Sequence, residues 1–366
     1  MSITVSWSIE DYYLFLSSVP VIGARRFAKI IKQFPTAASF LVADRQQLIG
    51  SGISDAVADE LLAARPTTDI AALWRQVHQE DVTLLRHTDE TYPPLLRQIY
   101  DWPPLLYHRG TVRADRPLVA VVGSRQPTSY GEQATAEIVT GLVAAGIGIV
   151  SGVARGIDQA AHRAALAAGG YTIGVLGTGL DRASAGNAAK QSLMATMVAN
   201  GGAVISEFPF GTPGSKFTFP LRNRLISGMS SAVVVVEAAA KSGALITAQS
   251  ALDQNRVVLA VPGSIFSPTS VGCHQLIYQG AVMATNAADI LSELGWASAP
   301  AAPPAAPPEL TGDAQIIWRT LSAAPCHIDR LIWQTGLASD TVNALLVQLE
   351  LANLIRHLGG RQYIRL

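Results

Sequence analysis

The sequence has few of the residues that build metal sites and disulfide frameworks, and it lacks long apolar runs. Its two cysteines, Cys273 and Cys326, lie far apart and form no Cys-x-x-Cys or Cys/His cluster, which argues against a disulfide framework or a zinc site. No stretch reaches the ~18 uninterrupted apolar residues of a membrane span. Glu10 and Asp11 precede any long apolar run. We therefore expect a cytoplasmic protein without a metal site or a membrane segment.

The sequence also lacks an excess of either charge. It has 27 Lys and Arg residues against 27 Asp and Glu residues, and only 15% of the chain is charged, below the usual share of roughly 25%. Hydrophobic residues make up 49%, which excludes disorder for most of the chain. Because the net charge is zero, a polyanion would have to be held by a local cluster of cations rather than by a global field.

Nucleotide-binding motifs are absent as well. There is no G-x-x-x-x-G-K-[ST] sequence, and the run from Gly177 to Arg182 has arginine where the dinucleotide fingerprint requires its third glycine. The P-G-G-x-G-T-x-x-E signature of nucleotide-cleaving Rossmann proteins is also missing. We expect no cofactor.

Composition divides the 366 residues into parts. Alanine and proline alternate with almost nothing else from Ala297 to Pro308, a composition typical of a semi-rigid extended linker. Residues 1–85 predict short helices, residues 86–296 an α/β domain, and residues 309–366 a small terminal domain of three helices and a hairpin. That plan is typical of a winged helix.

Short apolar runs in the α/β domain alternate with helical stretches, which predicts a mostly parallel sheet with helices on both faces. Ligands on such sheets bind beyond the carboxyl ends of the strands. The expected strands are 118–122, 147–151, 172–176, 203–206, 232–236 and 257–261.

Glycines dominate the positions that follow these strands. Gly123 begins the sequence Gly-Ser-Arg after the first strand, and Gly152 follows the second. Glycine lets backbone N–H groups approach an anion, and a following helix N-terminus adds partial positive charge. Arg125 would supply donors suited to phosphate oxygens. The structural alternative is that these glycines only form tight turns.

The segment from Lys216 to Arg224 combines three cations, two phenylalanines and an asparagine. Cations that follow phosphates and aromatic rings that stack on bases are what a single strand of nucleic acid requires. The alternative is that Phe217 and Phe219 belong to the core and the arginines to a solvated face. Lys241 follows a later strand end and offers another cation, although Ser242 beside it also fits a plain helix cap.

These motifs together resemble the DNA-processing protein A (DprA/Smf) family. The resemblance covers the whole middle domain and is carried by six stretches of sequence, Val121–Arg125, Ser151–His162, Ile205–Glu207, Phe219–Arg224, Lys241–Ala248 and Val261–Gly263.

The resemblance implies an extended Rossmann domain between an N-terminal all-α domain of the SAM or helix-hairpin-helix kind and a C-terminal winged helix. It implies a protein that binds single-stranded DNA without hydrolysing it, forms a homodimer through the Rossmann domain, and helps load RecA onto incoming strands during natural transformation. Phe219 would stack on a base, and Lys241 would be a rim contact. The other implied DNA-binding residues are Gly123, Ser124, Arg125, Gly152, Lys216, Arg222, Asn223 and Arg224.

Two features leave alternatives open. The family's Tyr-Pro-x-x-Asn element is missing after Asp181, so the role of that loop is not set by the resemblance. Asp158, His162 and Glu207 could instead converge as acid or base groups of a nucleotide hydrolase-like enzyme. Against this, Asp158 suits a helix N-cap, with His162 packed one turn later.

The flanking domains are expected to contribute less to DNA binding. The stretches 19–26 and 48–53 predict hairpins between helices, and a role in scaffolding or protein contact is favoured for them. The expected recognition helix of the winged helix, 340–351, has no Arg or Lys, which argues against strong major-groove binding.

Overall fold

The computed structural model describes residues 6–296, 310–322, 324–352 and 354–365. Two compact units, Met1–Ser298 and Ala299–Leu366, divide the chain. The expected linker, 297–308, lies outside the described residues. Within the part that is described, no helix combines the length and the apolar character needed to cross a bilayer.

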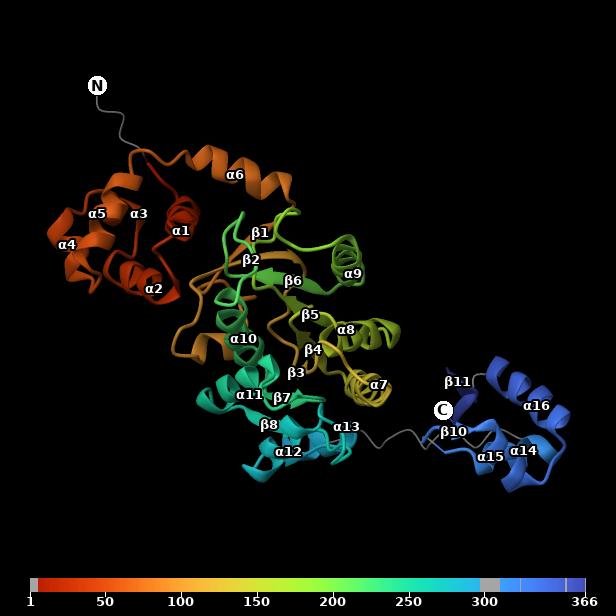
Figure 1. The fold of residues 1–366 in the computed structure, drawn as a ribbon. Helices are drawn as coiled ribbons and strands as arrows, with labels where there is room; N and C mark the ends of the chain where they lie inside the picture. Colours follow the sequence, from red (N-terminus) through yellow and green to blue (C-terminus); the bar gives the residue numbers. More distant parts are fainter. Residues whose placement is uncertain (1–5, 297–309, 323, 353, 366) are drawn as a thin grey trace. The chain divides into compact units, whose positions relative to one another are not determined.

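Helices make up the first part of the larger unit, as the sequence predicts (Figure 1). Capping boxes formed by Ser8, Thr36 and Asp44 begin three of them. The phenol of Tyr107 lies 2.6 Å from the Ser17 hydroxyl, which ties this helical part to the sheet. The helices are α1 (Ile9–Ser18), α2 (Ala24–Gln33), α3 (Ala37–Leu41), α4 (Arg45–Gly50), α5 (Asp55–Ala64) and α6 (Ile70–Gln79).

A nine-stranded sheet with the order β1-β2-β6-β5-β4-β3-β7-β8-β9 forms the middle of this unit. All six predicted strands are present and pair in parallel, with Val119 opposite Ile149 and Val121 opposite Val234. The antiparallel pair β1 and β2 extends one edge, and β1 begins at Thr83, inside the range expected for the helical domain. The strands are β1 (Thr83–Arg86), β2 (Leu105–Gly110), β3 (Leu118–Val122), β4 (Gly148–Ser151), β5 (Thr172–Val175), β6 (Ala203–Ser206), β7 (Ala232–Val235), β8 (Val257–Ala260) and β9 (Val282–Met283).

Helices cover both faces of this sheet, which confirms the predicted α/β architecture (Figure 1). One face packs on α7 (Ser129–Ala144), α8 (Ile157–Ala167) and α13 (Ala287–Glu293), and the other on α10 (Thr218–Gly228), α11 (Gly243–Asp253) and α12 (Val271–Tyr278). The remaining helices are α9 (Ala188–Ala199) and the short 3-10 helix η1 (Leu95–Gln98). Strands β4, β5 and β6 are added on one side of β3, whereas β7, β8 and β9 are added on its other side. The carboxyl ends of β3 and β7 therefore form the topological switch point of the sheet.

The smaller unit has the predicted winged-helix plan. Its core contains Ile317, Leu331 and Leu346, and its sheet has the order β10-β12-β11. The short strand β10 is an addition to the predicted elements. The elements are α14 (Gly312–Thr320), β10 (Cys326–His327), α15 (Ile328–Thr335), α16 (Ser339–Leu351), β11 (Ile355–Gly359) and β12 (Gln362–Arg365).

Candidate nucleic-acid interface

The loop after β3 places Arg125 at the surface beside α10. Gly123 is required there, because a Cβ atom at this position would lie 2.7 Å from the Ile157 side chain. The Ser124 carbonyl accepts a hydrogen bond of 3.0 Å from the N–H of Ile157, which fixes the loop on the start of α8. The exposed Arg125 guanidinium carbon lies 5.6 Å from the ring centroid of Phe219. The fold thus brings together two of the residues predicted to bind DNA.

Two glycines position the Phe219 ring. A Cβ atom at Gly177 would lie 2.8 Å from the Phe219 Cδ1 atom, and one at Gly214 would lie 2.7 Å from its Cζ atom. The half-buried ring therefore rests in a cradle that only glycine can form, and Arg125 lies over it. A guanidinium beside an aromatic ring offers a phosphate contact next to a stacking face.

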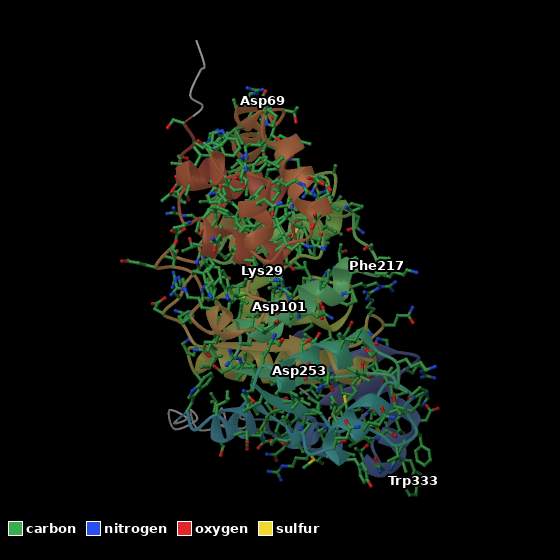
Figure 2. The ribbon with its side chains drawn as sticks, turned by 90° about the vertical axis from the view of Figure 1, so that its left-hand side faces the viewer. Lys29, Asp69, Asp101, Phe217, Asp253 and Trp333 are labelled. Carbon is green, nitrogen blue, oxygen red and sulfur yellow. The ribbon has the colours of Figure 1, made fainter. Side chains whose placement is uncertain are left out.

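Lys216 and Phe217 lie immediately before α10 and are both exposed. The Lys216 ammonium lies 5.2 Å from the Phe217 ring centroid, and 69% of Phe217 is accessible to solvent. Figure 2 shows Phe217 at the periphery of the molecule beside the green α10. The sequence left open whether this ring belongs to the core. The structure exposes it and adds a second aromatic face near Phe219.

Arg222 does not present its charge to solvent, contrary to its expected role as a DNA-gripping cation. Only 4% of the residue is exposed, and its Nη1 atom donates to the carbonyls of Gly152, at 2.7 Å, and Val175. Gly152 is needed for this contact, because a Cβ atom there would lie 2.6 Å from Nη2. Burial lowers the pKa of Arg222 to about 10, and the charge of Asp158 opposes that shift. Arg222 and Gly152 hold the ends of β4 and β5 together.

Asn223 and Arg224 are also internal. Each is 9% exposed, and the Asn223 amide donates to the Gly243 carbonyl at 3.3 Å. Arg224 forms ion pairs of 2.5 Å with Glu207 and 3.1 Å with Asp101. The expectation of an extended basic groove fails because Asn223 is buried against the start of α11 and the charge of Arg224 is paired with internal carboxylates. They support the site but do not form its surface.

Lys190 is a candidate that sequence reasoning missed. It lies in the first turn of α9, which is capped by Asn187, and it is half-buried. Burial and the nearby charge of Arg222 lower the pKa of the Lys190 ammonium to about 8, against the opposing effect of Asp158. The Lys190 side chain packs against Gly186 in the loop after β5, where a Cβ atom would lie 3.0 Å from its Cδ atom, and its charge is felt together with those of Arg222 and Asp158. Its only sequence signal was its position shortly after the loop that lacks the Tyr-Pro-x-x-Asn element. We call Arg125, Lys190, Lys216, Phe217 and Phe219 the strand-end site.

Lys241 lies apart from this cluster in the contacts that the structure describes. It is exposed in the loop between β7 and α11, on the other side of the switch point. Ser242 beside it caps α11 by accepting the N–H of Ala244 at 3.3 Å, as the structural alternative predicted. Its role as a rim contact remains a prediction.

A buried carboxylate occupies the switch point itself. Glu237, 2% exposed, accepts hydrogen bonds from the Thr128 N–H at 2.9 Å and the Thr128 hydroxyl at 2.6 Å, and a third from Thr269 at 3.0 Å. A Cβ atom at Gly131 would lie 2.3 Å from the same carboxylate. The protein's own anion therefore takes the place at the start of α7 where a nucleotide phosphate would bind. Arg125, by contrast, is exposed at the end of β3.

The three groups considered for acid or base catalysis do not converge. His162 is fully buried, its Nδ1 atom is 2.7 Å from the Thr172 hydroxyl, and burial lowers its pKa to about 3. The Asp158 carboxylate accepts the N–H groups of Gly152 at 3.1 Å and Ala154 at 3.3 Å. Glu207 is held by Arg224. Among the described residues, no cluster of three or more His, Cys, Asp or Glu side chains could bind a metal.

Comparison with known proteins identifies the family. The family described as DNA recombination-mediator protein A matches residues 83–295, more than half of the chain, and the DprA winged helix domain matches residues 301–361. The chain belongs to the DNA recombination-mediator protein A family. This confirms the resemblance to DprA/Smf proteins that the sequence motifs indicated.

Relatives and solved structures of this family agree. The chain is 42% identical over 231 residues to Protein Smf of Escherichia coli K12, a match that covers 63% of this chain and 61% of the relative. The X-ray structure of DNA processing protein A from Streptococcus pneumoniae superposes with a TM-score of 0.67 at 35% identity, covering 78% of this chain and 96% of that one. The DNA processing protein A of Helicobacter pylori, studied for its single-stranded DNA binding mode, has a TM-score of 0.52 at 27% identity, with coverages of 58% and 95%. The structural matches confirm the Rossmann fold of the DprA family, and the family match to residues 301–361 confirms the winged helix.

Proposed function

We propose that this protein binds single-stranded DNA at the strand-end site, protects it, and helps load RecA onto it during natural transformation. The observation that carries the proposal is the approach of Arg125 to Phe219, with Lys216 and Phe217 beside them at the surface. Cations next to exposed aromatic faces suit a strand whose bases are free to stack. The family's description as a recombination mediator and the single-strand binding mode studied in the Helicobacter pylori relative support the same conclusion.

The proposal assigns the protein a non-enzymatic, cytoplasmic role. Asp158 and Glu207 are engaged in internal contacts, and His162 is fully buried. The internal positions of these three groups support a non-enzymatic role. Incubation of the pure protein with nucleoside monophosphates and with DNA should release neither base nor shortened strand. Release of either that increases with protein concentration would favour the nucleotide hydrolase-like alternative instead.

The direct test measures the affinity for an oligonucleotide by fluorescence anisotropy over a range of salt concentrations. Combining Arg125→Ala with Lys216→Ala should weaken binding by roughly tenfold or more. It should also reduce the salt slope by about 1.4, since each phosphate contact on a single strand contributes about 0.7. The matched control combines Arg113→Ala with Arg116→Ala, because these arginines precede β3 at the opposite end of the strands. Equal affinities of wild type and the Arg125/Lys216 variant would refute the proposal.

RecA loading requires a separate measurement. RecA filament growth on an oligonucleotide already covered by a competing single-strand binding protein should start faster in the presence of this protein. The Arg125→Ala variant should give less acceleration, because it delivers less bound DNA. A protein that binds DNA normally but leaves filament growth unchanged would remove RecA from the proposal and leave DNA binding in place.

We also propose a homodimer through the Rossmann domain. Several large apolar side chains are exposed near β9, which ends the sheet: Phe266 is 90% exposed, Tyr278 94% and Met283 53%. Exposed apolar groups beside an open sheet edge are typical of an interface. Sedimentation should show a dimer for wild type and a monomer when Phe266→Glu is combined with Tyr278→Glu. Both side chains are almost fully exposed, so their loss should leave the fold intact. An unchanged dimer would exclude this surface.

A further inference from the structure

A polar groove lies beside the loop that carries Arg125. It has a volume of about 490 Å³ and is bordered on one side by Gln126 and Glu132 and on the other by Arg155, Gln159 and Arg163. We call it the arginine groove. Its described lining contains no aromatic side chain, so it differs from the strand-end site in chemistry.

The two arginines of the groove are exposed and available to a ligand. Arg155 lies just before α8, and Arg163 lies in the second turn of that helix. Positions 159 and 163 share one helix face, and the Arg163 guanidinium donates to the Gln159 amide at 3.2 Å. Among the described residues, neither arginine has a carboxylate within ion-pair distance. Two guanidinium groups that form no ion pair with the described residues therefore line the groove together with one carboxylate, that of Glu132.

The groove adjoins the backbone of the loop that carries Arg125. Gly156, which lines the groove, has a positive φ of 92°, and a Cβ atom there would lie 2.2 Å from the Ser124 carbonyl oxygen. Only glycine allows the loop of Arg155 to lie this close to the loop of Arg125. Gln126 follows Arg125 directly and forms part of the groove wall. The groove that Arg155 lines therefore begins one residue beyond Arg125.

We propose that the arginine groove binds the phosphodiester backbone of the nucleotides that flank those held at the strand-end site. This inference rests on the proposed function and adds a direction to the path of the DNA. The guanidinium groups of Arg155 and Arg163 suit the non-bridging phosphate oxygens, and the amides of Gln126 and Gln159 add neutral donors. Without an aromatic face the groove follows the backbone independently of base sequence. The Glu132 carboxylate opposes the phosphates and limits the affinity.

The test compares two lengths of labelled oligothymidylate by fluorescence anisotropy, roughly 6 and roughly 25 nucleotides, a range that separates a short site from an extended one. Combining Arg155→Ala with Arg163→Ala should weaken binding of the long strand about tenfold and change binding of the short strand less than about twofold. The salt slope for the long strand should fall by about 1.4, the share of two phosphate contacts. The control is again the variant with both Arg113→Ala and Arg116→Ala.

Glu132→Gln provides a second, opposite test that does not depend on the stability of the arginine variant. Removing this carboxylate should strengthen binding of the long strand and leave the short one unchanged. A further arm adds ATP or inorganic phosphate as competitor against the long strand. If either displaces the DNA from wild type as well as unlabelled oligonucleotide does, the groove is a free-phosphate site and the inference is overturned.

The outcomes separate this inference from the function on which it rests. If wild type binds neither oligonucleotide, the proposed function itself fails. If Arg125→Ala abolishes binding but the Arg155/Arg163 variant binds both lengths like wild type, only the groove is excluded. The inference would also be overturned if the Arg155/Arg163 variant bound the short and the long oligonucleotide with equally reduced affinity. The same holds if the Arg113/Arg116 control weakened binding of the long oligonucleotide as much as the Arg155/Arg163 variant does. Neither result would locate the effect on the flanking nucleotides.

Discussion

Replacing Arg222 by leucine tests whether this cation supports the site from within or contacts DNA itself. The guanidinium is 4% exposed and donates to two strand-end carbonyls, those of Gly152 and Val175. Hydrogen bonds to a charged group contribute roughly 1.5–3 kcal/mol each, so losing two should cost about 3–6 kcal/mol. At about 2 °C per kcal/mol for a unit of this size, the midpoint of thermal unfolding should fall by roughly 6–12 °C.

The same substitution should make stability more dependent on pH. Burial raises the pKa of Asp158, and the positive charge of Arg222 opposes that rise. Without Arg222 the folded-state pKa of Asp158 moves further above its unfolded value. An acid of this kind stabilises the fold at low pH, and that contribution is lost as the pH rises through the folded-state pKa. The stability deficit of Arg222→Leu should therefore be larger at about pH 8 than at about pH 5.

Urea unfolding followed by tryptophan fluorescence at both pH values measures this deficit, with Arg125→Leu as the matched control. The control removes an exposed guanidinium, so it should leave the unfolding midpoint near that of wild type while lowering the affinity for single-stranded DNA. The reasoning is refuted if Arg222→Leu keeps the wild-type midpoint and loses DNA affinity as Arg125→Leu does. That result would mean that Arg222 reaches the strand.

Three further predictions concern residues in and around the site. DNA affinity should decline as the pH rises through about 8, because the Lys190 ammonium is charged below that value and neutral above it. In titrations at constant ionic strength, Lys190→Arg should remove this decline. Gly177→Ala should displace the Phe219 ring and weaken oligonucleotide binding severalfold. The control Gly50→Ala, where a Cβ atom meets nothing within 4 Å, should bind like wild type. If Gly50→Ala weakened binding and Gly177→Ala did not, the Phe219 ring would be excluded as a stacking face. Glu237→Ala leaves the Thr128 N–H without its acceptor and should lower the free energy of unfolding by about 1–3 kcal/mol, with calorimetry detecting no acquired affinity for nucleotides.

Much of the fold could be predicted from local sequence. Runs of β-branched residues located six of the seven strands that pair in parallel, because a strand buried on both faces needs continuous apolar sequence. Strands β1, β2, β9 and β10 were not predicted. β9 and β10 have two residues each, too few to show a pattern, and β1 reads Thr-Leu-Leu-Arg, which is equally compatible with a helix.

The candidate site was predictable only in part. The sequence by itself determined which loops meet, since parallel strands bring their carboxyl ends to one edge, and it therefore indicated Arg125 and Phe219. The tertiary structure decided which cations face solvent. Arg222 and Arg224 are buried because their partners, among them Gly152, Val175, Asp101 and Glu207, come from distant segments that only the folded sheet brings together. Lys190 joins the site for the same reason, because the position of a charge depends on packing between segments and not on its neighbours along the chain.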